Sequence, residues 1–493
     1  MWHKLSIDQK INLIKRKIGK AVAREQYDSA LLLIKCLANI LLNYNQYYKD
    51  DFLEEQLGIL REKLFDASDK PVQSGQTDGG SIFFYDGVGV DDGLELIYVK
   101  GLVKAGYHVV YLVRESAKGK FPLLQTWLEN YHAEVIYIPT GLSTLEECRY
   151  IYEAQNRADI RAGFLYALPY DVAGVMAFMG ADNRYIRYRI NFVDHAYWLG
   201  GRGAFDYCVE FRDVGAFLSN SYRGIPKKDI ILLPYYPYID QEKEFEGFPF
   251  PVEAGDFIIF SGGTLYKTID KKENLYYKMI EFCLSEFENT KFWYAGGGED
   301  RDAVELKRLQ QKYNGRVFWS KGGRNDLFQV LQHVDLYLNT YPVGGGLMLQ
   351  YAAAAGRIPL IFYRTIEARC LTLLGQEKLG IEFNDLTAWE EEVRKLILDE
   401  KYRKMKEQRI TNACIDPDTF DKNLVSILEE QETEYGISCA DVGGLQEIQK
   451  TYRQRFGEHG IEEVIGKESY LPLLKVCPFI YLYSRIVKRI EEQ

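Results

Sequence analysis

Apolar residues near the start of the chain recur at the spacing of an α-helix. Ile11, Ile14 and Ile18 lie three or four residues apart, and the stretch from Leu31 to Leu41 repeats the pattern. Such spacing places apolar side chains on one face of a helix. We therefore predict a helical N-terminal region over residues 1–75. The polar stretch Asp66–Gly80 at its end is interpreted as a linker.

From residue 80 the pattern changes to short apolar runs separated by amphipathic stretches. Strands that alternate with helices indicate an α/β fold with a mainly parallel sheet, covered on both faces. We predict a first Rossmann-like domain over residues 80–245. Its expected strands are Ser81–Tyr85, His108–Val113, Glu134–Ile138, Ala162–Tyr166, Arg189–Val193, Asp206–Glu210, Phe217–Ser219 and Ile230–Leu233.

A second series of the same kind follows a charged, proline-containing stretch, Asp240–Gly255, which is interpreted as an interdomain hinge. The series predicts a second Rossmann-like domain over residues 255–435, facing the first across a cleft, and further helices over residues 440–493. Packing of these last helices on the first domain is favoured over peripheral membrane contact. The expected strands are Phe257–Ser261, Lys291–Ala295, Arg316–Trp319, Leu336–Asn339 and Ile358–Phe362.

Composition and charge narrow the range of functions. The 493 residues carry a net charge of -10, which argues against a nucleic-acid partner because such binding needs a basic surface. The eight cysteines form no CxxC pair, so reduced core thiols are expected rather than a zinc site or disulfides. No signal peptide and no long apolar run is evident, and a cytoplasmic location is the expectation.

Two glycine-containing stretches of the second domain have the chemistry of a phosphate site. In the first, Gly262, Gly263 and Thr264 follow a strand and precede Lys267. Glycines let backbone approach a phosphate, and lysine supplies a compact positive charge. A strand-to-helix turn with a solvated lysine is the alternative, because the sequence is not a Walker A motif.

In the second stretch, a strand runs into Gly344, Gly345 and Gly346, and a helix containing Leu347 and Gln350 follows. Backbone N–H groups at a helix N-terminus suit a diphosphate, although glycines also serve tight strand–helix packing.

A third loop, with Gly322, Gly323 and Asn325, is expected at the carboxyl edge of the same sheet. Ligands bind at this edge in open α/β sheets, so the loop could hold the base of a nucleotide. A plain surface turn fits the same residues.

The first domain carries one candidate for acid–base chemistry. Asp194 and His195 come directly after the predicted strand Arg189–Val193. Histidine titrates near neutrality and could remove a proton from an acceptor hydroxyl, while a buried structural histidine is the alternative. Asp86, in a Gly/Asp loop after the first strand, could bind an acceptor or cap a helix. No DxD metal motif stands at a strand end, so no essential metal is predicted.

Taken in this order, the four segments resemble a GT-B glycosyltransferase, and most of all the O-GlcNAc transferase family with its bacterial protein-glycosylating relatives. The segment Leu265-Tyr266-Lys267 is similar to the family's LYK segment, which implies that Lys267 binds the donor diphosphate. Val334–Pro359 resembles the family's glycine-loop stretch, and Phe205–Tyr207 and Leu233–Tyr235 resemble the segments that end its first domain. The resemblance covers roughly Tyr188–Leu360.

Two departures concern the donor site. The acidic ribose contact of the family is replaced by Tyr351, with Gln350 one position away as a possible substitute. The paired glutamates that are usual in retaining enzymes of this fold are not evident.

The resemblance implies a metal-independent glycosyltransferase without a cofactor, in which a nucleotide sugar, UDP-GlcNAc or UDP-Glc, is the donor. A protein or peptide acceptor is the first choice and a glycan the next. Lys267, Asp194 and His195 are the expected catalytic residues. A UDP-sugar epimerase and a non-catalytic glycosyltransferase-like subunit of a glycosylation complex are the alternatives. A homo- or hetero-oligomer is compatible with each.

Overall fold

A computed structural model describes residues 5–65, 80–89, 93–182, 184–201, 203–270, 273–322, 324–364, 380–410, 415–437, 446–467, 478 and 481–482. The chain divides into two compact units, which are described separately. Unit 1 comprises Met1–Tyr235, Asp418–Ala440 and Tyr452–Gln493, and unit 2 comprises Tyr236–Pro417 and Asp441–Thr451. Within the described ranges no helix is long and apolar enough to span a membrane.

Unit 1 is built on a parallel sheet of seven strands within the described ranges, in the order β3-β2-β1-β4-β5-β6-β7. The strands are β1 (Ser81–Asp86), β2 (Val109–Arg114), β3 (Glu134–Ile138), β4 (Ile160–Tyr166), β5 (Ile186–Asn191), β6 (Tyr207–Glu210) and β7 (Ile230–Leu232). All six residues of β1 are buried, as expected for a parallel strand with both faces covered. The helices between the strands are α4 (Leu94–Lys104), α5 (Pro122–Asn130), α6 (Thr144–Gln155), α7 (Val172–Gly180) and α8 (Asp213–Ser221).

One predicted strand of this unit is wrong. Phe217–Ser219 lies inside the helix α8, in which Val214, Ala216 and Leu218 are buried. A short apolar run cannot be assigned to a strand or a buried helix from its periodicity alone. The flanking Asp213 and the glycine at position 215 belong to the same helix, so the run is its buried face.

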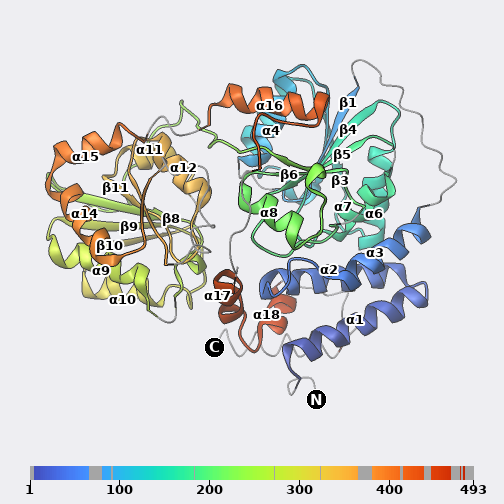
Figure 1. Ribbon diagram of the computed structural model, residues 1–493, viewed down its shortest axis with the longest axis horizontal. Coiled ribbons are helices and arrows are strands. Elements are labelled where there is room, and N and C mark those ends of the chain that lie inside the picture. Colours follow the sequence, from blue (N-terminus) through green and yellow to red (C-terminus); the bar gives the residue numbers. More distant parts are fainter. Residues whose placement is uncertain are drawn as a thin grey trace. The chain divides into compact units, whose positions relative to one another are not determined.

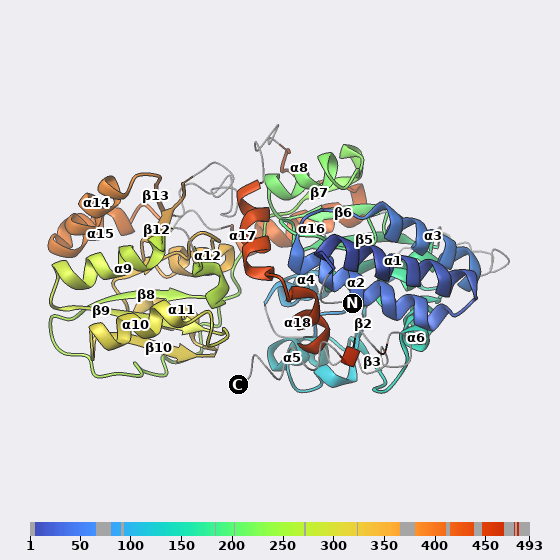
Figure 2. The same cartoon turned by 90° about the horizontal axis from the view of Figure 1, so that it is seen from below.

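The N-terminal helices are part of the core of unit 1 (Figures 1 and 2). They are α1 (Ile7–Ala23), α2 (Tyr27–Tyr44) and α3 (Asp51–Leu64). Ser6 and Gln9 form a capping box that starts α1. Apolar residues of all three helices pack in one cluster with Phe83 and Tyr85 of β1. The three helices lie within the region predicted to be helical, and the predicted linker, apart from Gly80, lies outside the described residues.

Helices from the end of the chain also belong to unit 1. They are α16 (Pro417–Glu430) from Asp418 on, the part of α17 (Gln446–Phe456) from Tyr452 on, and α18 (Gly460–Lys467). The sheet face that carries Phe84 and Phe164 is covered by α4 and α16. The sequence had placed residues up to 435 in the second domain, but Asp418–Ala440 lies in unit 1. Helix α18 lies beside α2 (Figure 2). Its Glu462 forms a buried ion pair with Lys10 of α1 at 2.7 Å. The segment Tyr470–Ile490 lies outside the described residues apart from 478, 481 and 482.

Unit 2 contains a second parallel sheet, of six strands within the described ranges, in the order β10-β9-β8-β11-β12-β13. The strands are β8 (Phe257–Gly262), β9 (Thr290–Gly296), β10 (Val317–Lys321), β11 (Leu336–Leu338), β12 (Pro359–Phe362) and β13 (Ile381–Phe383). The helices are α9 (Leu275–Glu286), α10 (Val304–Lys312), α11 (Leu327–Gln332), α12 (Gly346–Ala354), α14 (Leu386–Leu398) and α15 (Glu400–Glu407).

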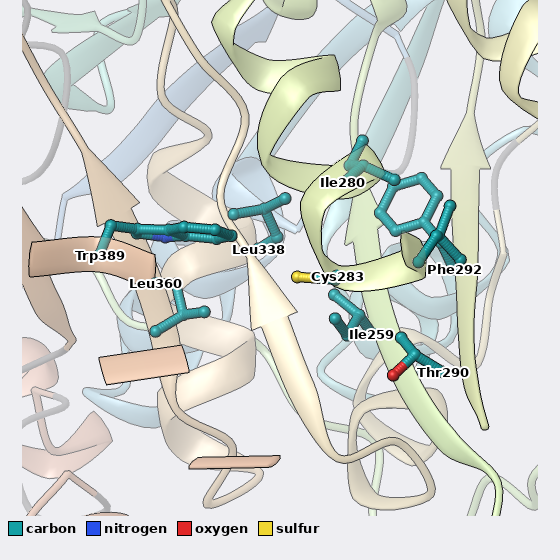
Figure 3. A pocket seen from close by; sticks show the side chains of 9 residues that line it. Ile259, Ile280, Cys283, Thr290, Phe292, Leu338, Leu360 and Trp389 are labelled. Atoms are coloured by element: carbon teal, nitrogen blue, oxygen red, sulfur yellow. The ribbon is translucent and has the colours of Figure 1, made fainter. Parts of the chain in front are cut away.

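Successive side chains of β8 point to opposite faces of the sheet, and the two faces pack against different helices. Ile258 and Phe260 pack in a cluster with residues of α11 and α12. Ile259 lies on the other face, where it lines a small apolar cavity of about 10 Å³ with Cys283 of α9 and Trp389 of α14 (Figure 3). A cavity of this size has room for about one water molecule, so it is a packing gap and not a ligand site.

The stretch Asp240–Gly255, predicted as a hinge, contains neither helix nor strand. It is nevertheless fixed to unit 2, because Phe245, Phe248 and Phe250 pack against the cluster around Trp293.

The cysteines were predicted to be reduced thiols of the core. The four that the structure describes are free and buried: Cys36, Cys148, Cys208 and Cys283.

Candidate functional site

The order of the strands in unit 2 places two loops beside each other. Strands β8 and β11 are neighbours, and the sheet grows in opposite directions from them. Ligands of open α/β sheets bind at such a switch point, outside the carboxyl ends of the strands. Gly263–Lys267 follows β8, and Asn339–Gly345 follows β11. The two glycine-containing segments predicted from the sequence are therefore the two loops of the switch point.

The loop after β8 depends on close approach of backbone to backbone. Gly263 has a φ of +127° and donates its N–H to Ala295 O at 3.1 Å. A Cβ added to the neighbouring Gly296 would lie 1.8 Å from Gly263 O, so a side chain at position 296 would displace the loop. Gly262, at the end of β8, is buried, and Thr264 is exposed. The glycines thus fix the path of the chain into Lys267.

Lys267 lies in the short 3-10 helix η4 (Leu265–Thr268) and is half-buried. No carboxylate within ion-pair distance of its ammonium occurs among the residues that the structure describes. Many other lysines of unit 2 have such a partner, for example Lys291 with Asp256 at 2.6 Å. A half-buried positive charge without a counter-charge favours an anionic ligand.

The loop after β11 leads into an uncapped helix. Gly345 is the N-cap of α12, and no side chain caps the helix. Asn339 holds the loop in place, since its Oδ1 accepts the N–H of Gly345 at 3.1 Å and the hydroxyl of Tyr337 at 3.2 Å. Gly344, Gly346 and Leu347 are half-buried. The N–H groups of the first turn and the positive end of the helix dipole are thus suited to an anion.

A hydrogen bond joins the two loops. The N–H of Val343 donates to Lys267 O at 3.1 Å. A Cβ on Gly262 would lie 3.2 Å from Met348 Cε of α12, so strand end and helix are in close contact as well. Lys267 and the N-terminus of α12 therefore belong to one site in unit 2.

The third predicted loop lies at the same edge of the sheet. Gly322 follows β10 with a φ of +130°, and its N–H points to Gly296 O at 3.5 Å. Asn325 is exposed, whereas Arg324 is held by Asp326 through two hydrogen bonds of 2.7 and 2.6 Å. Gly323 lies outside the described residues. Recognition of a base by this loop stays a prediction.

Gln350 and Tyr351 lie at the position where the donor ribose is expected. Gln350 is completely buried, so its side chain does not face solvent at the switch point. Tyr351, at the position of the expected acid, donates its hydroxyl to Tyr238 O at 2.7 Å within unit 2. A contact between Gln350 and the ribose of the donor stays a prediction.

In unit 1, Asp194 and His195 are in contact after β5. His195 Nδ1 lies 3.2 Å from Asp194 Oδ1, and its Nε2 lies 2.9 Å from Tyr452 Oη of α17. Asp194 is fully buried and forms a two-point ion pair with Arg212, at 2.5 and 2.8 Å. Burial alone would raise the pKa of Asp194, but the Arg212 guanidinium and its hydrogen bonds hold that pKa well below the usual range.

We call residues 194–200 the histidine loop, and it is braced from several elements of unit 1. Asn45, which ends α2, donates to His195 O at 3.1 Å and accepts from Tyr197 N at 3.2 Å. Glu54 of α3 accepts from Gly200 N at 3.0 Å. Arg223, which follows α8 in the chain, donates to the Asp194 and Ala196 carbonyl oxygens at 2.6 and 2.7 Å. The N-terminal helices thus position the histidine.

Sequence reasoning missed Asn45, Tyr452 and Glu210 as neighbours of this loop. Glu210 is completely buried at the end of β6, and its Oε1 accepts from Asn191 Nδ2 at 2.8 Å. Gly215 separates Glu210 from Asp194, because a Cβ there would lie 2.4 Å from Glu210 Oε2 and 3.0 Å from Asp194 Oδ2. The acid at the end of a predicted strand was the one signal that could have found Glu210.

Asp86 has a structural role. Its Oδ1 accepts the N–H groups of Val88 and Gly89 at 2.9 Å, and its Oδ2 accepts the Tyr111 hydroxyl at 2.6 Å. Because it is buried with these three donors, Asp86 caps its own turn rather than binding an acceptor.

Comparison with known proteins bears on the architecture. No protein-family model and no curated protein matches the chain. Among solved structures, a glycosyltransferase from Rickettsia africae is similar over 72% of this chain and 98% of its own, at 12% identity and a TM-score of 0.50. The chain has the GT-B fold.

Two further solved structures are similar at lower TM-scores. HepE from Anabaena in complex with UDP-glucose covers 71% of this chain and 99% of its own, at 13% identity and a TM-score of 0.49. A mutant O-GlcNAc transferase from Thermobaculum terrenum covers 90% of this chain and 84% of its own, at 13% identity and a TM-score of 0.43. The two parallel sheets and the similarity to the Rickettsia africae structure confirm the expected fold of two Rossmann-like domains.

Proposed function

We propose that this protein is a metal-independent glycosyltransferase that binds the diphosphate of a UDP-sugar on unit 2. The observation that carries the proposal is the joined pair of loops at the switch point of the second sheet. There Lys267 has no carboxylate partner among the described residues, and the uncapped start of α12 lies next to it through the Val343–Lys267 hydrogen bond. A lysine and free backbone donors at one place match the charge of a diphosphate.

The proposed reaction exchanges one C–O bond for another. The bond between the anomeric carbon and the acceptor oxygen forms, the bond between that carbon and the diphosphate oxygen breaks, and its electron pair leaves with UDP. Lys267 and the N–H groups in the first turn of α12, which begins at Gly346, stabilise the charge that develops on the leaving diphosphate. His195 of unit 1 takes the proton of the acceptor hydroxyl. UDP-GlcNAc and UDP-Glc are the donors we propose, with a protein, peptide or glycan as acceptor.

Binding of UDP tests the donor site. UDP should raise the melting temperature of the wild-type protein, and Lys267→Ala should abolish that rise without changing the melting temperature of the free protein. Lys278→Ala is the matched control, because Lys278 is an exposed lysine on the nearby helix α9. Absence of a UDP-dependent rise in the wild-type protein would refute the proposal.

Turnover separates this function from its alternatives. The protein is incubated with each UDP-sugar and with a peptide or a glycan, and free UDP and product mass are measured. Acceptor-dependent release of UDP with a heavier acceptor supports a transferase. Conversion of the UDP-sugar without an acceptor would identify an epimerase. Binding of UDP without turnover would identify a non-catalytic subunit, a candidate that the buried Gln350 and the engaged Tyr351 favour.

A further inference from the structure

The hydrogen bonds of His195 determine which of its nitrogens carries a proton. Asp194 is paired with Arg212 and is therefore ionised, so that its oxygen atoms only accept hydrogen bonds. The contact of 3.2 Å between Asp194 Oδ1 and His195 Nδ1 thus requires a proton on Nδ1. In the neutral ring, Nε2 then carries the lone pair, and the Tyr452 hydroxyl at 2.9 Å donates to it.

Tyr452 reaches this position because the end of α17 is fixed within unit 1. Phe456, one turn further along the helix, packs on Tyr44 of α2 with ring centroids 5.2 Å apart. Tyr452 is 9% exposed and His195 is 21% exposed, so the pair lies close to the surface. The hydroxyl of Tyr452 is therefore hydrogen-bonded to His195 Nε2, the atom that accepts the acceptor's proton in the proposed reaction.

We propose that, in the free protein, the Tyr452 hydroxyl occupies the place on His195 Nε2 that the acceptor hydroxyl takes during transfer. This inference rests on the proposed function. The lone pair of Nε2 accepts one strong hydrogen bond, so the tyrosine and the acceptor exclude each other. The acceptor that competes for Nε2 is an alcohol, such as a sugar hydroxyl or a serine or threonine side chain, whose O–H group replaces that of Tyr452.

Competition of this kind has a kinetic signature. Tyr452→Phe removes the internal competitor and leaves the aromatic packing of α17 in place. The KM for a hydroxyl acceptor should fall about fivefold, which corresponds to one hydrogen bond of ordinary strength, while kcat stays the same. A tyrosine that instead positioned His195 for catalysis would give a lower kcat in the variant. Glycosylation of Tyr452 itself would likewise overturn the inference, because the tyrosine would then be an acceptor.

The contact can also be tested without turnover. Diethyl pyrocarbonate modifies the unprotonated nitrogen of histidine, and mass spectrometry of peptides gives the rate at His195. The rate should rise about fivefold in Tyr452→Phe, since the hydrogen bond no longer covers Nε2. Tyr44→Phe is the matched control, because it removes a hydroxyl beside the same helix without touching His195. Melting temperatures close to that of the wild-type protein establish that both variants fold.

The outcomes separate this inference from the proposed function. If UDP does not bind and no sugar is transferred, the proposed function fails, and the modification rates still decide whether Tyr452 covers His195. If sugar is transferred but the acceptor KM is equal in Tyr452→Phe and the wild-type protein, only the inference about Tyr452 is overturned. Equal modification rates in these two proteins overturn it as well.

Discussion

Replacing Glu210 by glutamine should stabilise the protein above pH 7, because the mutation removes a carboxyl group that must ionise inside unit 1. Burial, the largest cause, and the nearby Asp194 carboxylate raise the pKa of Glu210, which lies at about 7 in the folded protein. Arg223 and the hydrogen bonds from Ser219 and Asn191 act in the opposite direction without cancelling the effect of burial. Glutamine has nearly the same volume and stays neutral.

The size and sign of the effect follow from the two pKa values of Glu210. In the unfolded chain the pKa is 4.5, and in the folded protein it is about 7, a difference that corresponds to about 3 kcal/mol. Below pH 4.5 the Glu210 carboxyl is protonated in both the folded and the unfolded state, and it does not lower the free energy of unfolding. As the pH rises from 4.5 to 7, the folded state binds more protons than the unfolded state, so the free energy of unfolding falls. Above pH 7 the free energy of unfolding is lowered by the full amount.

Urea unfolding at several pH values between 4.5 and 8 measures this difference. Protection of the β6 amides against hydrogen exchange reports on unit 1 specifically. The free energy of unfolding of Glu210→Gln should exceed that of the wild-type protein by up to about 3 kcal/mol at pH 8 and by little at pH 4.5. The control is Glu62→Gln, at an exposed position of α3. An equal dependence on pH in wild type and Glu210→Gln would refute the reasoning.

Three other substitutions test the two candidate sites and the apolar core of unit 2. Gly296→Ala should abolish the UDP-dependent rise in melting temperature, because its Cβ would collide with Gly263 O, whereas Gly297→Ala, with no atom within 4 Å of the added Cβ, should keep the rise. Asn45→Ala should lower the free energy of unfolding by about 1–3 kcal/mol in urea, since the histidine loop loses both of its hydrogen bonds to that side chain. Trp389→Ala should cost about 3–5 kcal/mol, because it enlarges the apolar cavity of unit 2; a loss below 1 kcal/mol would show that the cavity collapses.

The sequence was most informative where a local pattern determines the structure. The apolar run before Gly262 ends in glycines, as does the run before Gly344, and this pattern of a buried strand followed by a loop predicted the two segments that meet at the switch point of unit 2. Phe217–Ser219 was misassigned because three apolar residues fit a strand and a buried helix equally well.

Contacts between residues far apart in the sequence could not be predicted from one chain. Nothing in the spacing of residues links Tyr452 to His195, 257 positions away, or Asn45 to the histidine loop, 150 positions away. Such contacts depend on how the N- and C-terminal helices pack on the first sheet. The burial of Gln350, which lies one position from the expected ribose contact, could not be read from the sequence either.

The ion pair between Lys10 and Glu462 has a consequence for the synthesis of the protein. The first sheet is complete when Leu232 has left the ribosome, but Lys10 is buried against a carboxylate that is made 230 residues later. At about 5–20 residues per second this delay is roughly 10–50 seconds. During that time the whole of unit 2 is made, while α1 and α2 lack α18. The first unit to begin folding is therefore also the last to be completed.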